Sequence, residues 1–259
     1  MIPLLDLKFQ HAKLNKQFLS AARKVINSGV YILGPEGRHF EEEFARVCQS
    51  SYCVGVSSGT QALQIALQAC GIGPGDEVAV PTFTFIATAT AVSAVGARPL
   101  LVDISPSDLN IDIEDLKKRR TSKIRGIIPV HLYGYPAPLT PIWELAKKYH
   151  WKVIEDCAQA HGAVYRGKQV GSQSDFGAFS FYPSKNIGAL GDAGAITTQD
   201  KTMYELCMSL RNAGRSKGSQ YEHPLIGNNF RLDELQAAFL RVKLPKLKTW
   251  LQARRQIAL

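Results

Sequence analysis

Short apolar runs along this chain alternate with segments whose apolar residues recur every three or four positions. The runs have the length and β-branched content of buried strands and lie at 52–56, 77–80, 98–102, 124–130, 151–155, 177–181 and 194–198. Helical spacing occurs before the first run, at 11–28 and 40–48, and separates most of the later runs, at 62–67, 84–95, 139–149 and 201–213. This alternation predicts an α/β fold with a largely parallel sheet covered by helices on both faces.

The two ends of the chain add helical segments to this core. Residues 1–35 predict an N-terminal helical segment, and the Gly34-Pro35 break predicts that the next helix restarts at Phe40. Residues 232–259 predict a helix interrupted near Pro245. We therefore expect a large domain over 1–230. Because the chain stops inside a helical pattern, we expect 231–259 to begin the connection to a truncated C-terminal domain.

Composition limits the classes of partner. The 259 residues are 45% hydrophobic, which is ordinary for a soluble globular chain, and carry a net charge of +9. Basic residues gather at 117–125 and at 241–255, on helix-like segments without interleaved aromatic pairs. Such clusters predict solvated helix faces rather than a groove for nucleic acid. We expect no nucleic-acid partner.

Cysteine usage and hydropathy indicate a cytoplasmic protein. The five cysteines form no CxxC pair and no metal-like cluster with histidine, so we expect reduced thiols and no metal. The first ten residues lack the basic and apolar regions of a secretory signal. Residues 78–97 carry no charge, but Pro81, the threonines and Gly96 favour a buried strand and helix over a membrane span.

Lys185 is the first candidate for chemistry. It stands between a strand-like run that contains Phe176, Phe179 and Phe181 and a loop with glycines at 188, 191 and 194. A lysine held and desolvated in this way can act as a nucleophile toward a carbonyl. Alone, it is as well explained as a solvated surface lysine.

Two further segments have a functional and an ordinary explanation. Ser58-Gly59-Thr60 follows a strand and opens a helix, which makes an anion site or a simple N-cap. Asp156 ends another strand, where ligands of open α/β sheets bind, although it is equally explained as a helix cap. His131 and His161 are expected to be hydrogen-bonded structural histidines. The segment 162–169 resembles a P-loop but ends in Gln169, which lacks the magnesium-binding hydroxyl.

Taken together, these three candidates indicate one cofactor. Pyridoxal 5′-phosphate requires a lysine for its aldehyde, a carboxylate for its ring nitrogen and an anion cradle for its phosphate. Lys185, Asp156 and the turn at 58–60 supply these groups.

The chain also resembles a known family, the DegT-like sugar-nucleotide aminotransferases, which are fold-type-I pyridoxal-phosphate enzymes. The resemblance runs from near the N-terminus to the last helix. The motifs that carry it are GP at 34–35, FEEEF at 40–44, SGT at 58–60, PTFTF at 81–85, HLYG at 131–134, EDCAQAHGA at 155–163, FSFYPSKN at 179–186 and GNNFR at 227–231. It implies a three-layer large domain and a small C-terminal domain that this chain lacks.

The resemblance also implies a role for each matching residue. Lys185 binds the cofactor covalently and later moves a proton, and Asp156 pairs with the pyridinium nitrogen. Phe85 and Ala158 cover the two faces of the ring, and Gln159 binds its hydroxyl. The residues that hold the phosphate are Ser58, Gly59, Thr60, the backbone of Gln61, Ser180 and, from a neighbouring subunit, Asn229. The expected assembly is therefore a homodimer with shared active sites.

The implied reaction is transamination of a nucleotide-linked keto sugar with L-glutamate as amino donor. A sister branch of dehydratases carries histidine at the lysine position, so Lys185 argues against that branch. The loop 186–194 resembles that of members acting on 3-keto sugars. This favours a dTDP-3-keto-6-deoxyhexose, and a product used for lipopolysaccharide O-antigen, another polysaccharide or an antibiotic. The alternatives are a 4-keto substrate, of the GDP-perosamine or UDP-4-amino type, and a non-catalytic regulatory protein.

Overall fold

The computed structural model describes residues 5–219 and 221–258; positions 1–4 and 259 of the predicted terminal helices lie outside this description. Seven strands form one sheet in the order β1-β9-β8-β5-β4-β2-β3. Their bounds are β1 (Tyr52–Val56), β2 (Glu77–Pro81), β3 (Arg98–Val102), β4 (Ile124–Ile127), β5 (Lys152–Asp156), β8 (Phe176–Ser180) and β9 (Gly194–Thr198). A separate hairpin joins β6 (Val164–Tyr165) to β7 (Lys168–Gln169).

One strand runs against the others. β9 pairs antiparallel with both β1 and β8, whereas every other pairing in the large sheet is parallel. The prediction of a mostly parallel sheet is therefore confirmed. Ser180, the last residue of β8, faces Gly194, the first residue of β9, so the loop between them returns to the edge from which it left.

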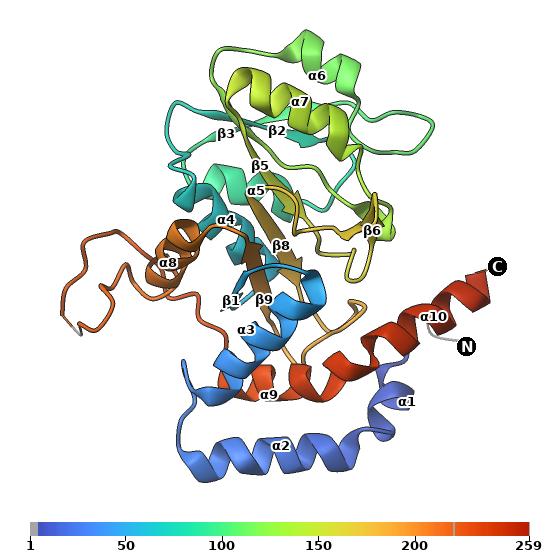
Figure 1. The fold of residues 1–259 in the computed structure, drawn as a ribbon, viewed down its shortest axis with the longest axis vertical. Helices are drawn as coiled ribbons and strands as arrows, with labels where there is room; N and C mark the ends of the chain where they lie inside the picture. The colour runs from blue at the N-terminus through green and yellow to red at the C-terminus, as the bar shows by residue number, and fades with distance from the viewer. Residues whose placement is uncertain (1–4, 220, 259) are drawn as a thin grey trace.

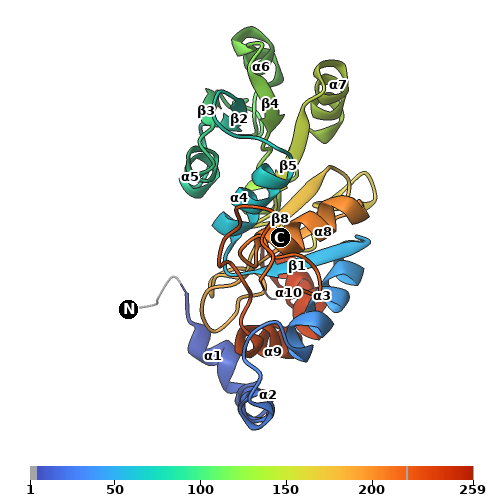
Figure 2. The ribbon, with the colours of Figure 1, turned by 90° about the vertical axis from the view of Figure 1, so that its left-hand side faces the viewer.

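Helices cover both faces of the sheet, as the fold prediction required (Figures 1 and 2). Alternate strand residues enter different clusters: Ile154 and Ile196 pack with α4, α5 and α8, whereas Val153 and Ala195 lie in the clusters of the opposite face. This three-layer packing is the α/β arrangement. The main helices are α1 (Leu7–Ala12), α2 (Asn15–Ser28), α3 (Pro35–Cys48), α4 (Gly59–Ala69), α5 (Ala87–Ala94), α6 (Ile113–Arg119), α7 (Leu139–Tyr149), α8 (Lys201–Leu210), α9 (Glu234–Lys243) and α10 (Leu247–Ala258), with short 3₁₀ turns at Leu132–Gly134 and Leu244–Lys246.

The start of α3 differs from the prediction. The helix begins at Pro35 rather than Phe40, because proline is tolerated at the first helical position. The cap comes from a distant residue: the carboxylate of Glu234 accepts the N–H groups of Gly34, Glu36 and Gly37 at 2.8–2.9 Å. A local sequence pattern therefore does not reveal this cap. The predicted break near Pro245 is confirmed between α9 and α10.

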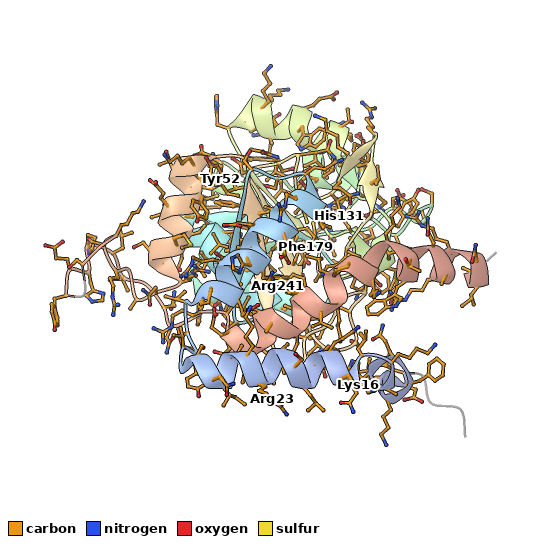
Figure 3. The ribbon with its side chains drawn as sticks, turned by 60° about the horizontal axis from the view of Figure 1, so that its bottom comes forward. Lys16, Arg23, Tyr52, His131, Phe179 and Arg241 are labelled. Atoms are coloured by element: carbon orange, nitrogen blue, oxygen red, sulfur yellow. The ribbon has the colours of Figure 1, made fainter. Side chains whose placement is uncertain are left out.

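The expectation of a solvated basic face is wrong for two residues of α9. Figure 3 shows Lys16 and Arg23 on α2, both exposed, and labels Arg241 on α9. Arg241 pairs with Glu36 and Glu43, and Lys243 is fully buried. The reason is that α9 packs against both α2 and α3.

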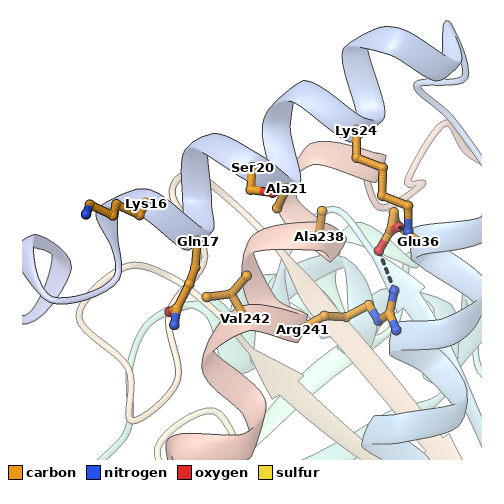
Figure 4. Close-up of a pocket in the computed structure, with 9 residues that line it drawn as sticks. All are labelled: Lys16, Gln17, Ser20, Ala21, Lys24, Glu36, Ala238, Arg241 and Val242. Atoms are coloured by element: carbon orange, nitrogen blue, oxygen red, sulfur yellow. Dashed lines mark hydrogen bonds and ion pairs between the residues drawn. The ribbon is translucent and has the colours of Figure 1, made fainter.

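Charged groups also line a hollow of about 470 Å³ between α2 and α9 (Figure 4). Within it, the carboxylate of Glu36 binds both Lys24 and Arg241. Two of the three cations at this surface are thus already neutralised by protein groups.

None of the described helices combines the length and apolar character that a bilayer crossing requires.

Candidate active site

A cavity of about 510 Å³ lies at the carboxyl edge of the sheet. Its lining comes from the segments that follow β1, β2, β4, β5 and β8, because parallel strands end at the same edge. The lining residues are Ser58, Gly59, Thr60, Leu63, Thr84, Phe85, Ala87, Val130, Leu132, Asp156, Ala158, Gln159, Ser180, Tyr182, Ser184, Lys185 and Asp192. Nine of the eleven predicted site residues are among them.

Asp156 is the buried acid of this cavity. Its Oδ2 accepts a hydrogen bond of 2.9 Å from the hydroxyl of Thr88, and its Oδ1 accepts one of 3.1 Å from the N–H of Ala158. Thr88 is itself 2.8 Å from the hydroxyl of Thr84, which lines the cavity. Burial raises the pKa of Asp156, and the hydrogen bonds from Ala158 and Thr88 oppose that rise by stabilising the carboxylate.

Lys185 lies in the turn that follows β8, where its N–H donates to the carbonyl of Tyr182 at 2.8 Å. The side chain is half-buried and lines the same cavity as Asp156. Burial lowers the pKa of Lys185, and the negative charge of Asp156 opposes that change. A lowered pKa increases the fraction of neutral amine, which is the nucleophilic form.

The turn at 58–60 forms the N-terminus of α4. The hydroxyl of Ser58 accepts the N–H of Gln61 at 3.3 Å, which is the ordinary N-cap. Among the described residues, no protein acceptor is found for the N–H groups of Gly59 and Thr60. These donors and the positive end of the helix dipole can therefore bind an anion.

Two glycines hold this turn close to the neighbouring strands. A Cβ on Gly59 would lie 2.7 Å from Cβ of Ser180, and a Cβ on Gly194 would lie 2.8 Å from the nitrogen of Gly59. Real Cβ atoms do not approach other heavy atoms so closely. The absence of side chains at 59 and 194 thus lets the hydroxyl-bearing Ser180 stand directly against the turn.

Gln159 has an amide group of fixed orientation. Its Oε1 accepts a hydrogen bond of 2.9 Å from the backbone N–H of Tyr133, a residue with the positive φ of 54°. Because a backbone N–H can only donate, the atom facing it must be the oxygen. The NH₂ group of Gln159 is then left to donate to a ligand in the cavity.

Two predicted residues do not line the cavity. The backbone N–H of Gln61, which was expected to hold the phosphate, donates to the hydroxyl of Ser58 at 3.3 Å, and its role toward a phosphate stays a prediction. Asn229 is exposed and is not among the residues that line the cavity of its own chain. Its backbone forms an antiparallel β-bridge with Asn212. Phe85 and Ala158 both line the cavity, and Phe85 is 70% exposed.

Sequence reasoning missed Thr84, Thr88, Tyr182 and Asp192. Thr84 and Thr88 are four residues apart in a predicted helix, which places them on one face. That spacing was the available signal. Their connection to Asp156 required knowing that β2 and β5 end at the same edge of the sheet.

The two histidines are structural. His131 accepts the N–H of Ala137 at Nδ1, and its Nε2 lies 2.9 Å from Oε2 of Glu155, which confirms the prediction for this residue. His161 is buried among Phe44, Phe179 and Phe181. Neither of its ring nitrogens has a hydrogen-bond partner among the described residues, so the expectation of a hydrogen-bonded histidine is wrong for His161. Burial lowers its pKa to about 3, so the ring is neutral.

Relatives match nearly the whole chain. The profile of the DegT/DnrJ/EryC1/StrS aminotransferase family matches residues 12–259. The chain is 47% identical over 249 residues to the dTDP-3-amino-3,4,6-trideoxy-alpha-D-glucose transaminase of Streptomyces venezuelae, covering 96% of this chain and 65% of that protein. It is 50% identical over 258 residues to the dTDP-3-amino-3,6-dideoxy-alpha-D-galactopyranose transaminase of Aneurinibacillus thermoaerophilus, covering 100% and 70%.

A solved structure shows the same fold. The crystal structure of S. venezuelae DesV in complex with a ketimine intermediate has a TM-score of 0.93 and 46% sequence identity, covering 96% of this chain and 66% of that one. The present chain spans about two thirds of the length of these relatives.

Proposed function

This chain belongs to the DegT/DnrJ/EryC1/StrS aminotransferase family, and from that membership and its cavity we propose a pyridoxal-phosphate-dependent aminotransferase. The proposed reaction moves an amino group from L-glutamate to a keto sugar carried on a nucleotide. The supporting observation is one cavity that contains the buried acid Asp156, the half-buried Lys185 and the open N–H groups of Gly59 and Thr60.

The cavity fits the cofactor. Unpartnered N–H groups at the start of α4, with Thr60 and Ser180 beside them, suit a phosphate. The carboxylate of Asp156 keeps one lone pair on each oxygen free, although each already accepts one hydrogen bond, and thus suits a protonated ring nitrogen. The free NH₂ group of Gln159 suits the ring hydroxyl, and Phe85 and Ala158 suit the two ring faces.

Chemistry is then divided between the cofactor and the chain. When bound, pyridoxal phosphate supplies the conjugated ring that accepts the electron pair of the broken C–H bond. The carboxylate of Asp156 would hold the ring nitrogen and stabilise positive charge there. The amine of Lys185, whose pKa is lowered by burial, would take the proton from the α-carbon of the amino donor and would later return one to the sugar carbon.

The favoured substrate is a dTDP-linked 3-keto-6-deoxyhexose. Support comes from the loop 186–194 and from two relatives named for dTDP-3-amino sugars. The products would serve the synthesis of amino-sugar polysaccharides, O-antigens or antibiotics. In the same proposal, residues 1–230 form the cofactor domain and 231–259 begin the connection to a smaller domain.

The proposed assembly is a cytoplasmic homodimer in which Asn229 reaches the phosphate of the partner's site. Asn229 is exposed, and apolar side chains stand exposed at the cavity or beside it, with Phe85 at 70%, Ile86 at 65% and Tyr133 at 77%. An exposed apolar group of this kind supports a protein contact. All five cysteines are free, which suits a reducing compartment.

Absorbance spectroscopy tests the proposed class. The protein mixed with pyridoxal phosphate should develop a band from covalent attachment to Lys185, and L-glutamate should shift it. Incubation with L-glutamate and with 3-keto or 4-keto sugar nucleotides, followed by mass spectrometry, identifies the substrate. Absence of both the band and the shift contradicts the proposed class, and amination of only the 4-keto substrates overturns the favoured ketone.

A further inference from the structure

A fully buried lysine, Lys243, contacts the loop that follows Lys185. Lys243, the last residue of α9, has an exposed fraction of 0%. Its Nζ lies 2.6 Å from the carbonyl oxygen of Gly188 and 3.0 Å from Nε2 of His11, and 5.7 Å from the ring centre of Phe18. Among residues 5–219 and 221–258, no carboxylate lies within 4.0 Å of this amine.

An amine in this position is costly to bury. Removing an ammonium group from water without a carboxylate partner destabilises the charged form. Burial accordingly lowers the pKa of Lys243 to about 8, so the group remains mostly protonated near neutral pH. As a cation it donates charge-assisted hydrogen bonds, which are stronger than bonds between neutral groups. An apolar residue would fill the same space without this cost.

The amine binds the segment that joins Lys185 to Asp192. Other contacts hold the same segment: Ala189 N–H donates to the carbonyl of Phe181 at 2.7 Å, and Leu190 N–H donates to Oε1 of Gln236 at 2.9 Å. The exposed Arg254 of α10 also donates to Oδ1 of Asn186, at 3.3 Å. Gln236 also belongs to α9. Residues 186–192 are thus attached to α9 through Lys243 and Gln236 and to α10 through Arg254, and of these two cations Lys243 is the buried one.

The same amine also binds the N-terminal helix. α1 has no buried residue of its own, and its His11 contacts both the amine of Lys243 and the ring of Phe18. Because the Lys243 ammonium can only donate, His11 accepts with a neutral ring. Figures 1 and 2 show α1 and α2 beside α9 at the end of the molecule away from α6 and α7.

We propose that Lys243 is a positioning residue, whose amine fixes residues 186–192 against α9 and against α1, and so fixes the cavity wall between Lys185 and Asp192. The anchoring follows from the contacts of the chain alone. Its consequence for the reactivity of Lys185 rests on the proposed function.

Hydrogen exchange on this chain without cofactor tests the anchoring. Lys243→Met keeps the unbranched shape of the side chain up to the ε position and removes the amine and its donors. Amides of Ala189 and Leu190 should then exchange about fivefold to tenfold faster, which is the factor that one ordinary hydrogen bond contributes. Amides inside α4 should exchange as in the wild type, which separates a local effect from general unfolding. The amides of α1 should also exchange faster.

Two further variants isolate the contribution of each contact. His11→Leu removes the contact with α1 only, so it should accelerate exchange in α1 and leave Ala189 and Leu190 unchanged. Lys246→Met, an exposed lysine three residues away, is the matched control and should change neither. Unchanged exchange at Ala189 and Leu190 in Lys243→Met, or an equal change in Lys246→Met, overturns the proposal.

Covalent trapping then tests the consequence for Lys185. Pyridoxal phosphate is added, the adduct is reduced with borohydride, and labelling of the Lys185 peptide is followed by mass spectrometry. Lys243→Met should label several times more slowly than the wild type, and labelling at the wild-type rate contradicts the consequence. No labelling of the wild type would instead refute the proposed function, while the exchange result would still decide the role of Lys243.

Discussion

The hydroxyl of Thr88 donates a hydrogen bond of 2.9 Å to the carboxylate of Asp156, and both side chains are buried. A carboxylate in such a place is costly to ionise, because burial removes it from water. The bonds from Thr88 and from the N–H of Ala158 partly compensate for this cost. Thr88 therefore helps to keep Asp156 in the charged form that a protonated ring nitrogen requires.

Replacing Thr88 by valine should weaken that charged form. The Thr88→Val variant keeps the shape and removes the donor, so the pKa of Asp156 should rise further above its ordinary value. Affinity for pyridoxal phosphate should fall by about tenfold or more, the factor expected for a hydrogen bond to a charged group. Carbon-13 NMR of the Asp156 carboxyl group and cofactor titration by fluorescence measure the two effects.

Thr88→Ser is the matched control, since it keeps the hydroxyl. Both the pKa of Asp156 and the cofactor affinity should stay near the wild-type values. If valine and serine change them equally, the hydrogen bond is not the cause.

Asp156→Asn should separate stability from cofactor binding. The folded-state pKa of Asp156 is raised, so between the unfolded-state pKa and this higher value the folded protein holds a proton that the unfolded chain has released. The stability that Asp156 contributes is thus present at low pH and is lost as pH rises through this window. Without cofactor, the asparagine variant should become more stable relative to wild type as pH rises, and should bind cofactor more weakly.

Urea unfolding at a series of pH values from 4 to 8 measures this difference. A stability difference that stays constant with pH would contradict a raised pKa at Asp156.

Lys185→Ala should abolish covalent attachment of the cofactor. Loss of the proton-transferring amine alone lowers the rate by about 10²–10⁴-fold. Borohydride reduction followed by peptide mass spectrometry tests the attachment, and a coupled assay of 2-oxoglutarate formation tests turnover. A Lys185→Ala protein with wild-type turnover would remove Lys185 from the mechanism.

Gly59→Ala should disturb the phosphate turn. The new methyl group would lie 2.7 Å from Cβ of Ser180, so strand β8 or helix α4 must shift. Overpacking of this kind costs about 1–3 kcal/mol of unfolding free energy. Gly73→Ala is the control, because its nearest neighbour would lie at an ordinary 3.6 Å. Equal midpoints of chemical unfolding for the two variants would refute the steric argument.

Glu234→Ala should destabilise the start of α3. The carboxylate accepts three backbone N–H groups there, which would lose their partner in a buried place. The expected loss is about 1–3 kcal/mol of unfolding free energy, measured by urea unfolding. Amides near Gly37 should lose protection first, and uniform loss over the whole protein would argue against a local cap.

The sequence predicted the parts of the fold that depend on local patterns. All seven strands of the large sheet lie close to their predicted positions, because each contains a short apolar run and most are buried along their length, the edge strand β3 being the exposed one. The predicted start of α3 was wrong because the cap of this helix is supplied by Glu234, about two hundred residues away in the sequence. Lys243 was misjudged for a similar reason: a local pattern does not show that a second and a third helix enclose it.

The candidate site divides in the same way. Lys185, Asp156 and the turn at 58–60 stand at strand ends and could be identified from spacing and from the family motifs. Thr88 could not be identified in this way, because it lies in helix α5 and its partner Asp156 ends strand β5, 68 residues later in the chain. Asn229 stays a prediction, since it lies outside the cavity of its own chain and its proposed target belongs to a second copy.

The reversed strand β9 has a consequence for how such a protein can diversify. Ser180 and Gly194 face each other in the sheet, so both ends of the intervening loop are fixed by backbone pairing. Substitution of the exposed Asp192 can alter the cavity wall while the turn at 58–60 and the buried acid stay in place. Under the proposed function, preference for one ketone over another can therefore change through a mutation at Asp192 without rebuilding the residues that would hold the cofactor.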